Sequence, residues 1–208
     1  MTWKGFKDIQ ATIYIDLTKS EEELWKSLDK DARWGVNKAK KSFLRIGKSN
    51  KEEAWERFYE IYEDTCRRGG IKPFKLKEIK KENSSLLLCI KENKIIAGAV
   101  IIENKEEEKI SLFLNASLPE FQGMQPNNLL YWTIIIYGKQ RGYKVFDLGG
   151  YQLNAKKGSK LYEINRFKER WGGEIIKYDI YSKNPFYILG RKMIRRFPFL
   201  KAIRDKFR

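Results

Sequence analysis

The sequence predicts an α/β protein with one mixed β-sheet and helices on both faces of that sheet. Apolar residues recur with helical spacing over two early segments, and the period then changes to that of strands. Three strand patterns follow one another as a meander, and a helix separates this meander from the next strand. Such a helix implies mixed strand pairing. The 208 residues, 42% of them hydrophobic, are enough for one sizeable core.

Each element follows from its local pattern. Residues 11–17 have the composition of a strand, and one long helix is expected over residues 20–43. Its apolar face comprises Leu24, Leu28, Ala32, Val36, Ala39 and Phe43. A second helix runs over residues 51–70 and ends at a Gly-Gly pair. The meander covers residues 84–117, a helix capped by Asn127 or Asn128 covers 126–143, and strands at 144–150 and 173–183 enclose a helix at 158–173.

Charge favours a polyanionic partner. Lys and Arg number 43 against 27 Asp and Glu, which gives a formal net charge of +16. RNA, DNA, an anionic membrane surface or a phosphorylated substrate would suit this balance, although a merely Lys-rich composition would produce it too. The segment 184–208 carries +7 of this charge among apolar residues. We therefore expect one domain over residues 1–183 and a basic amphipathic tail over 184–208, suited to RNA or a membrane.

Histidine is absent from the sequence. This excludes Ser-His-Asp and Cys-His nucleophile systems and any histidine-based metal site, and we expect no metal. Cys66 and Cys89 have no metal-ligand spacing, so reduced thiols in a cytoplasmic protein are expected. The apolar runs are too short to span a bilayer.

Three motifs in order resemble one known family. They are "LWKSLDKDARWGVNKAKK", "NNLLYWTIIIYGKQRGYKVFDLGG" and "RFKERWGG". The sequence resembles the Fem family of peptidoglycan peptidyltransferases, specifically the C-terminal GNAT-like domain of that family. This resemblance implies a GNAT-like fold and transfer of an amino acid from aminoacyl-tRNA to an amine of a cell-wall peptide precursor. Fem proteins normally carry two GNAT-like domains, so a second copy or a separate second half is an expected partner.

The resemblance also implies the site residues. Lys168 and Asp147 are the candidate catalytic residues. The candidate substrate-binding residues are Arg33, Lys38, Lys40, Lys41, Gly149, Gly150, Tyr151 and Phe167. No cofactor is implied, because aminoacyl-tRNA is a co-substrate. Since lipid-linked precursors lie at the inner membrane face, peripheral association there is also expected.

The residues themselves leave alternatives open. Lys168 can stabilise an oxyanion or be an ordinary solvated lysine. Asp147 can orient an amine, but we favour a structural role in which it accepts backbone N–H bonds from the glycine turn. The cations around Arg33 and Lys38 can contact phosphates or form a solvated helix face.

Two other functions compete with aminoacyl transfer. An acyl-CoA-dependent N-acetyltransferase would need a glycine-rich loop before the helix at 126–143 to bind pyrophosphate. The loop "ASLPEFQGMQPNN" offers one glycine, and Pro126 has no N–H, which disfavours CoA. A non-catalytic domain that binds RNA or a membrane is the third reading. An assay of acyl-CoA and aminoacyl-tRNA as donors distinguishes the three.

Overall fold

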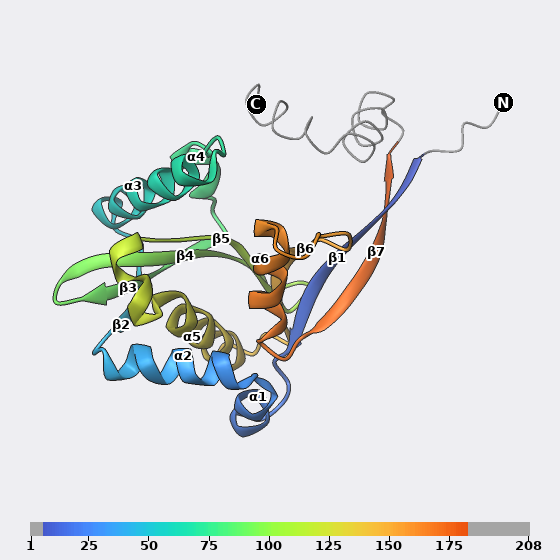
Figure 1. Cartoon of the computed structure of the whole chain (residues 1–208), viewed down its shortest axis with the longest axis horizontal. Coiled ribbons are helices and arrows are strands. Elements are labelled where there is room, and N and C mark those ends of the chain that lie inside the picture. The colour runs from blue at the N-terminus through green and yellow to red at the C-terminus, as the bar shows by residue number, and fades with distance from the viewer. Residues whose placement is uncertain (1–5, 183–208) are drawn as a thin grey trace.

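The computed structural model describes residues 6–182 and contains one seven-stranded mixed sheet (Figure 1). The strands are β1 (Phe6–Asp16), β2 (Arg45–Ser49), β3 (Ser84–Lys91), β4 (Lys94–Asn104), β5 (Lys109–Ser117), β6 (Val145–Tyr151) and β7 (Glu174–Ser182). Their order in the sheet is β2-β3-β4-β5-β6-β1-β7, and only the β5–β6 pair is parallel. The predicted α/β class and mixed sheet are confirmed. The tail expected over residues 184–208 lies outside the described residues.

Helices cover both faces of the sheet, as the sequence predicted (Figure 1). They are α1 (Glu21–Ser27), α2 (Lys30–Lys41), α3 (Glu52–Gly69), α4 (Leu76–Ile79), α5 (Pro126–Gln140), α6 (Lys160–Glu169) and the 3₁₀ helix η1 (Pro119–Met124). Helix α3 buries Trp55 and Phe58 on one face of the sheet. Helices α2 and α5 pack on the opposite face, where Val36 and Ile134 join the larger core cluster. The two clusters therefore lie on opposite sides of the central strands.

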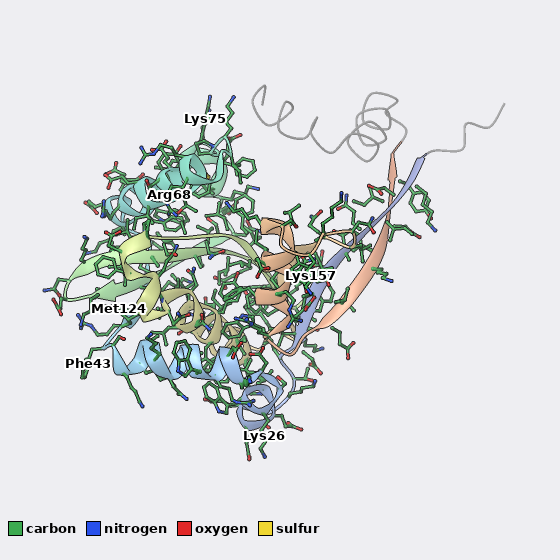
Figure 2. The ribbon with its side chains drawn as sticks, in the orientation of Figure 1. Lys26, Phe43, Arg68, Lys75, Met124 and Lys157 are labelled. Carbon is green, nitrogen blue, oxygen red and sulfur yellow. The ribbon has the colours of Figure 1, made fainter. Side chains whose placement is uncertain are left out.

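The prediction of a single helix over residues 20–43 is wrong. Two helices form instead, because the helical conformation ends at Leu28. Leu28 is extended, and the carboxylate of Asp29 accepts the backbone N–H of Ala32 at 2.7 Å, which starts α2. The predicted apolar face is nevertheless buried from Leu24 to Ala39. Phe43 is the exception: it follows the end of α2, is 80% exposed and projects outward in Figure 2.

Three short elements were not predicted from the sequence, and one of them, η1, lies in the segment that was expected to be a loop. Strand β2 lies at the edge of the sheet and is only partly buried, so its residues lack the apolar alternation of an interior strand. Helix α4 is four residues long, too short for a periodic signal. The expected cap of α5 also differs. Neither Asn127 nor Asn128 is its N-cap, since Gln125 holds that position without a side-chain cap bond and Pro126 is the first helical residue.

Strand β6 lies in the interior of the sheet, between β5 and β1. Its parallel ladder with β5 is short and joins only Lys109–Ser111 to Val145–Asp147. Beyond these three pairs β5 continues with Leu112 while β6 continues with Leu148, and no ladder joins them. The two strands therefore diverge immediately before the glycine pair of the "FDLGG" sequence.

We predict that Gly98→Ala destabilises the packing of α3 on the sheet. A Cβ atom at residue 98 would lie 2.5 Å from Cδ2 of Phe58 and 3.1 Å from the carbonyl oxygen of Leu87. Overpacking of this kind typically costs about 1–3 kcal/mol. Gly47→Ala is the matched control in another strand, because its Cβ would meet only Cδ1 of Ile90, at 3.8 Å. Urea unfolding measures both variants, and equal stability of the two would contradict this packing.

Candidate functional site

A cavity of about 800 Å³ occupies the place where β5 and β6 diverge, and we call it the strand cavity. Strand β5 contributes Leu112–Asn115, and the end of β6 contributes Leu148–Gly150. The beginning of α5 and one face of α6 complete it, with Gln122, Gln125, Pro126, Asn127, Asn128, Tyr131, Lys160, Glu163, Ile164, Phe167 and Lys168. The glycine pair of the "FDLGG" sequence therefore lies at the wall of this cavity.

Lys168 is fixed at the wall of this cavity. Helix α6 begins at Ser159, whose hydroxyl accepts the N–H of Tyr162, and it carries Lys168 in its last turn. The ammonium donates to the carbonyl oxygens of Gly149 at 3.1 Å and Gly150 at 2.9 Å. An ammonium has three N–H donors, so one stays available for a substrate oxygen. This half-buried, anchored side chain is not the ordinary solvated lysine of the alternative interpretation.

Burial lowers the pKa of Lys168 to about 8, while the charge of Asp147 acts in the opposite direction. A lysine with this pKa is mostly protonated at neutral pH and loses its charge within the range in which enzymes are assayed. Its ammonium can stabilise a developing negative charge, and its neutral amine can accept a proton.

Asp147 organises the glycine pair. Its Oδ1 atom accepts the hydroxyl of Thr12 on β1 and the backbone N–H of Gly149, the latter at 2.8 Å. Gly149 has φ +74°, and a Cβ there would lie 3.3 Å from the carbonyl oxygen of Leu112, so glycine fits this position best. Asp147 does not line the strand cavity. This geometry supports the structural role favoured from sequence rather than direct contact with a substrate.

The other residues expected near the glycine pair divide into two groups. Phe167 lines the strand cavity, and its ring packs edge-on against Tyr131 with centroids 5.1 Å apart. Tyr151 does not line the cavity. Its hydroxyl donates to Glu169 at 2.6 Å, and this bond with burial raises the pKa of Tyr151 to about 12. Tyr151 thus holds α6 to the end of β6.

The Trp-Gly-Gly sequence after α6 packs the end of this helix against the core, α1 and β1. Trp171 is fully buried in the larger core cluster. A Cβ atom at Gly172 would lie 2.5 Å from the carbonyl oxygen of Ser27 in α1, and one at Gly173 would lie 2.5 Å from Cγ2 of Ile13 in β1. The absence of side chains at both positions lets the end of α6 rest directly on these two elements.

The cations of α2 are not gathered at the strand cavity. The guanidinium of Arg33 donates to the carbonyl oxygens of Leu28 and, at 3.2 Å, Lys26, so it closes the junction between α1 and α2. Lys38 lies 4.7 Å from the ring centroid of Trp34, and Lys40 lies 5.8 Å from that of Trp25. Lys41 is exposed. Arg33 therefore has a structural role at this junction, its role as a phosphate contact stays a prediction, and none of the four cations lines either cavity.

A second cavity of about 620 Å³ lies beside the first, and we call it the helix cavity. It is lined by Lys30, Asp31, Trp34, Gln125, Asn128, Phe167 and Arg170. The two cavities share Gln125, Asn128 and Phe167, so they meet over the beginning of α5. Arg170 pairs with Asp31 at 3.3 Å and Asp29 at 3.7 Å, which ties the end of α6 to α2.

Sequence reasoning missed most residues of the helix cavity, because they come from three separate helices. Trp34 offered the one usable signal. It lies four residues from both Lys30 and Lys38, and it is 56% exposed. A single exposed aromatic residue is a weak signal, because such residues are common on protein surfaces. Asn128 was interpreted only as a possible helix cap.

The polar side chains that line the two cavities are lysines and an arginine, the carboxamides of Asn and Gln residues, the hydroxyl of Tyr131 and the carboxylates of Asp31 and Glu163. Residues 6–182 contain no cluster of Cys, Asp and Glu able to hold a metal ion. Over the same residues, no helix is both long and apolar enough to cross a membrane.

Comparison with known proteins places two family models along the chain. The FemAB family model matches residues 2–80, and an acetyltransferase (GNAT) domain model matches residues 82–162. A lipid II:glycine glycyltransferase of Staphylococcus aureus is 31% identical over 78 residues, which are 36% of this chain and 18% of the relative. The chain therefore matches less than a fifth of that relative's length.

Solved structures with low sequence identity share the fold. FemX superposes with a TM-score of 0.71 at 18% identity, covering 86% of this chain and 63% of FemX. The C-terminal domain of a putative lysylphosphatidylglycerol synthetase from Agrobacterium fabrum gives a TM-score of 0.69 at 14% identity, covering 92% of this chain and 67% of that one. The chain is thus similar to the FemAB family over residues 2–80 and to GNAT acetyltransferase domains over residues 82–162, and it shares its fold with FemX.

Proposed function

We propose that this protein transfers an amino acid from aminoacyl-tRNA to an amine of a cell-wall peptide precursor. The observation that carries the proposal is the anchored ammonium of Lys168, which keeps one N–H free at the strand cavity. The similarity to a lipid II:glycine glycyltransferase supports a peptide precursor as the acceptor. The net charge of +16 supports a polyanionic donor such as tRNA.

The reaction needs no histidine. The acceptor nitrogen attacks the ester carbonyl carbon of the donor, a C–N bond forms, and the carbonyl oxygen becomes an oxyanion. The C–O ester bond then breaks, and the proton lost by the nitrogen ends on the hydroxyl oxygen of the tRNA. An ester is already activated, so the protein has to orient two substrates and stabilise the oxyanion. Lys168 supplies the charge, and Phe167 supplies an apolar wall.

The beginning of α5 favours this donor over acyl-CoA. Pro126 occupies the first helical position and has no N–H, while the N–H groups of Asn128 and Leu129 bond to the carbonyl oxygen of Gln125. Few backbone donors are thus free to hold a pyrophosphate, which glycine-rich loops bind through several N–H groups. The side chains of Gln122, Gln125 and Asn127 line the cavity instead.

Location and assembly belong to the same proposal. A cytoplasmic protein that associates with the inner membrane face would meet lipid-linked precursors there, and the strongly basic composition supports such contact. A second copy of this chain, or a separate GNAT-like half, is the protein partner that we propose.

We predict that the chain uses aminoacyl-tRNA and not acyl-CoA. Total tRNA charged with a mixture of labelled amino acids should transfer label to lipid II when the full chain is added, and acetyl-CoA should transfer none. Free labelled amino acids with uncharged tRNA serve as the control. Acetyl transfer would establish the acyl-CoA alternative. Binding of tRNA without transfer of label would indicate the non-catalytic alternative.

We predict that Lys168→Met lowers single-turnover transfer by about 10²–10³-fold, the usual effect of removing one oxyanion donor. Stability should change little, because the variant loses two bonds to carbonyl oxygens but also removes a desolvated charge. Lys157→Met is the matched control, since Lys157 is exposed in the turn before α6 (Figure 2). Rates like those of the wild type in Lys168→Met would remove this residue from the mechanism.

The pH dependence of Lys168 distinguishes its two chemical roles. If the ammonium is the active form, its contribution is complete well below pH 8 and disappears as pH rises through about 8. The acceptor amine also ionises with pH, and this changes the rates of the wild type and of Lys168→Met alike. The ratio of the wild-type rate to the Lys168→Met rate removes this shared effect. This ratio should be constant at low pH and fall above pH 8. A ratio that rises through this range would make neutral Lys168 a general base.

A further inference from the structure

Asn128 is a largely buried polar side chain at the wall of both cavities. It is 7% exposed and occupies the first turn of α5. Its backbone N–H bonds to Gln125, but its carboxamide has no hydrogen bond to any of residues 6–182. A carboxamide can donate two bonds and accept two. Among the described residues, the enclosed side-chain atoms without a partner are Oδ1 of Asn127, Nε of Arg170 and Nε1 of Trp171, so the carboxamide of Asn128 is not sealed in the interior and stays accessible from the cavities.

The surroundings of Asn128 provide space for its carboxamide. Gly35 of α2 faces it, and a Cβ atom at residue 35 would overlap the side-chain nitrogen and carbon of Asn128. Helix α2 therefore approaches α5 with no side chain at the point of contact. Asn128 is not the cap of α5 either, since Gln125 holds that position. Neither packing nor capping thus accounts for an amide at this point.

The position of Asn128 points to a ligand. It is one of three residues that line both cavities, together with Gln125 and Phe167. A group at this junction can touch molecules that enter from either side. The beginning of α5 also carries the positive end of the helix dipole, which stabilises negative charge. Lys160 and Lys168 line the strand cavity against the single carboxylate of Glu163, so the charged residues of its wall add to this positive potential.

We propose that Asn128 is a catalytic residue that contacts the reacting groups of both substrates where the two cavities meet. Its Nδ2 atom donates to the carbonyl oxygen of the aminoacyl ester, and that oxygen becomes the oxyanion when the C–N bond forms. Its Oδ1 atom accepts an N–H of the attacking amine. This proposal rests on the proposed aminoacyl transfer and adds a second donor to the one supplied by Lys168.

Three variants of the full chain test the role in catalysis. Asn128→Ala removes both contacts, and the loss of one oxyanion donor predicts single-turnover transfer about 10²–10³-fold slower. Asn128→Asp keeps the shape but replaces the donor by a carboxylate oxygen, so its rate should fall at least as far. Asn154→Ala changes an exposed asparagine of the turn after β6 and should behave as the wild type does. Thermal unfolding of each variant shows whether the fold is retained.

Binding is measured separately from activity. Side-chain amide signals of ¹⁵N-labelled protein are followed by NMR during two titrations. One adds a glycyl-amide analogue of aminoacyl-adenosine, which cannot react, and the other adds a stem pentapeptide with a free lysine amine. Each probe alone should shift the Asn128 Nδ2 signals, while those of Asn154 should stay unchanged. The Asn128→Ala spectrum assigns the signals.

The outcomes separate this inference from the proposed function. If the wild type transfers label and folded Asn128→Ala retains its rate within about twofold, the inference is overturned and aminoacyl transfer stands. If the wild type transfers nothing from any aminoacyl-tRNA, the proposed function fails, and the catalytic role of Asn128 fails with it. NMR shifts from both probes would then still support a site for two ligands. Shifts from one probe or from neither would overturn contact with both substrates.

Discussion

The short parallel ladder between β5 and β6 is the constraint on which the site depends. After three residue pairs the strands separate, and the backbone groups on that edge of β6 need other partners. Strand β1 pairs with the other edge, where Thr12 lies opposite Gly150. The carbonyl oxygens of Gly149 and Gly150 accept bonds from Lys168. One gap in the hydrogen-bonding of the sheet thus creates the cavity and also anchors the cation that faces it.

The sequence was informative wherever a local pattern decides the structure. Hydrophobic periodicity gave the order of the longer elements. The glycine pair was expected to form a turn, but Gly149 and Gly150 lie within β6, close to a register shift in its pairing with β1. The helix break at Leu28 was missed because the apolar spacing continues across it, although Asp29 is a typical N-cap. The bonds from Arg33 to the carbonyl oxygens of Leu28 and Lys26 were not predicted for a related reason, because they exist only where the two helices meet.

Site residues that are brought together only by tertiary contacts could not be predicted from the sequence. The helix cavity exists only because α2, α5 and α6 meet, and no spacing along the chain brings Trp34, Asn128 and Arg170 together. Asparagine before a helix is a common cap, so sequence alone gave Asn128 a role that Gln125 holds in the structure. Burial and the lack of a partner became visible only in three dimensions. Such a residue departs from local rules, which is where functional positions are expected.

The position of β1 has a consequence for synthesis of the chain. This first strand lies between β6 and β7, so its partners are made more than a hundred residues later. Pairings so distant in sequence form slowly, and a nascent chain exposes unpaired strand edges until they do. The bond from Thr12 to Asp147 joins the same two segments. A chain whose synthesis ends before β6 therefore contains the complete meander. It lacks the glycine pair and any chemistry that depends on it.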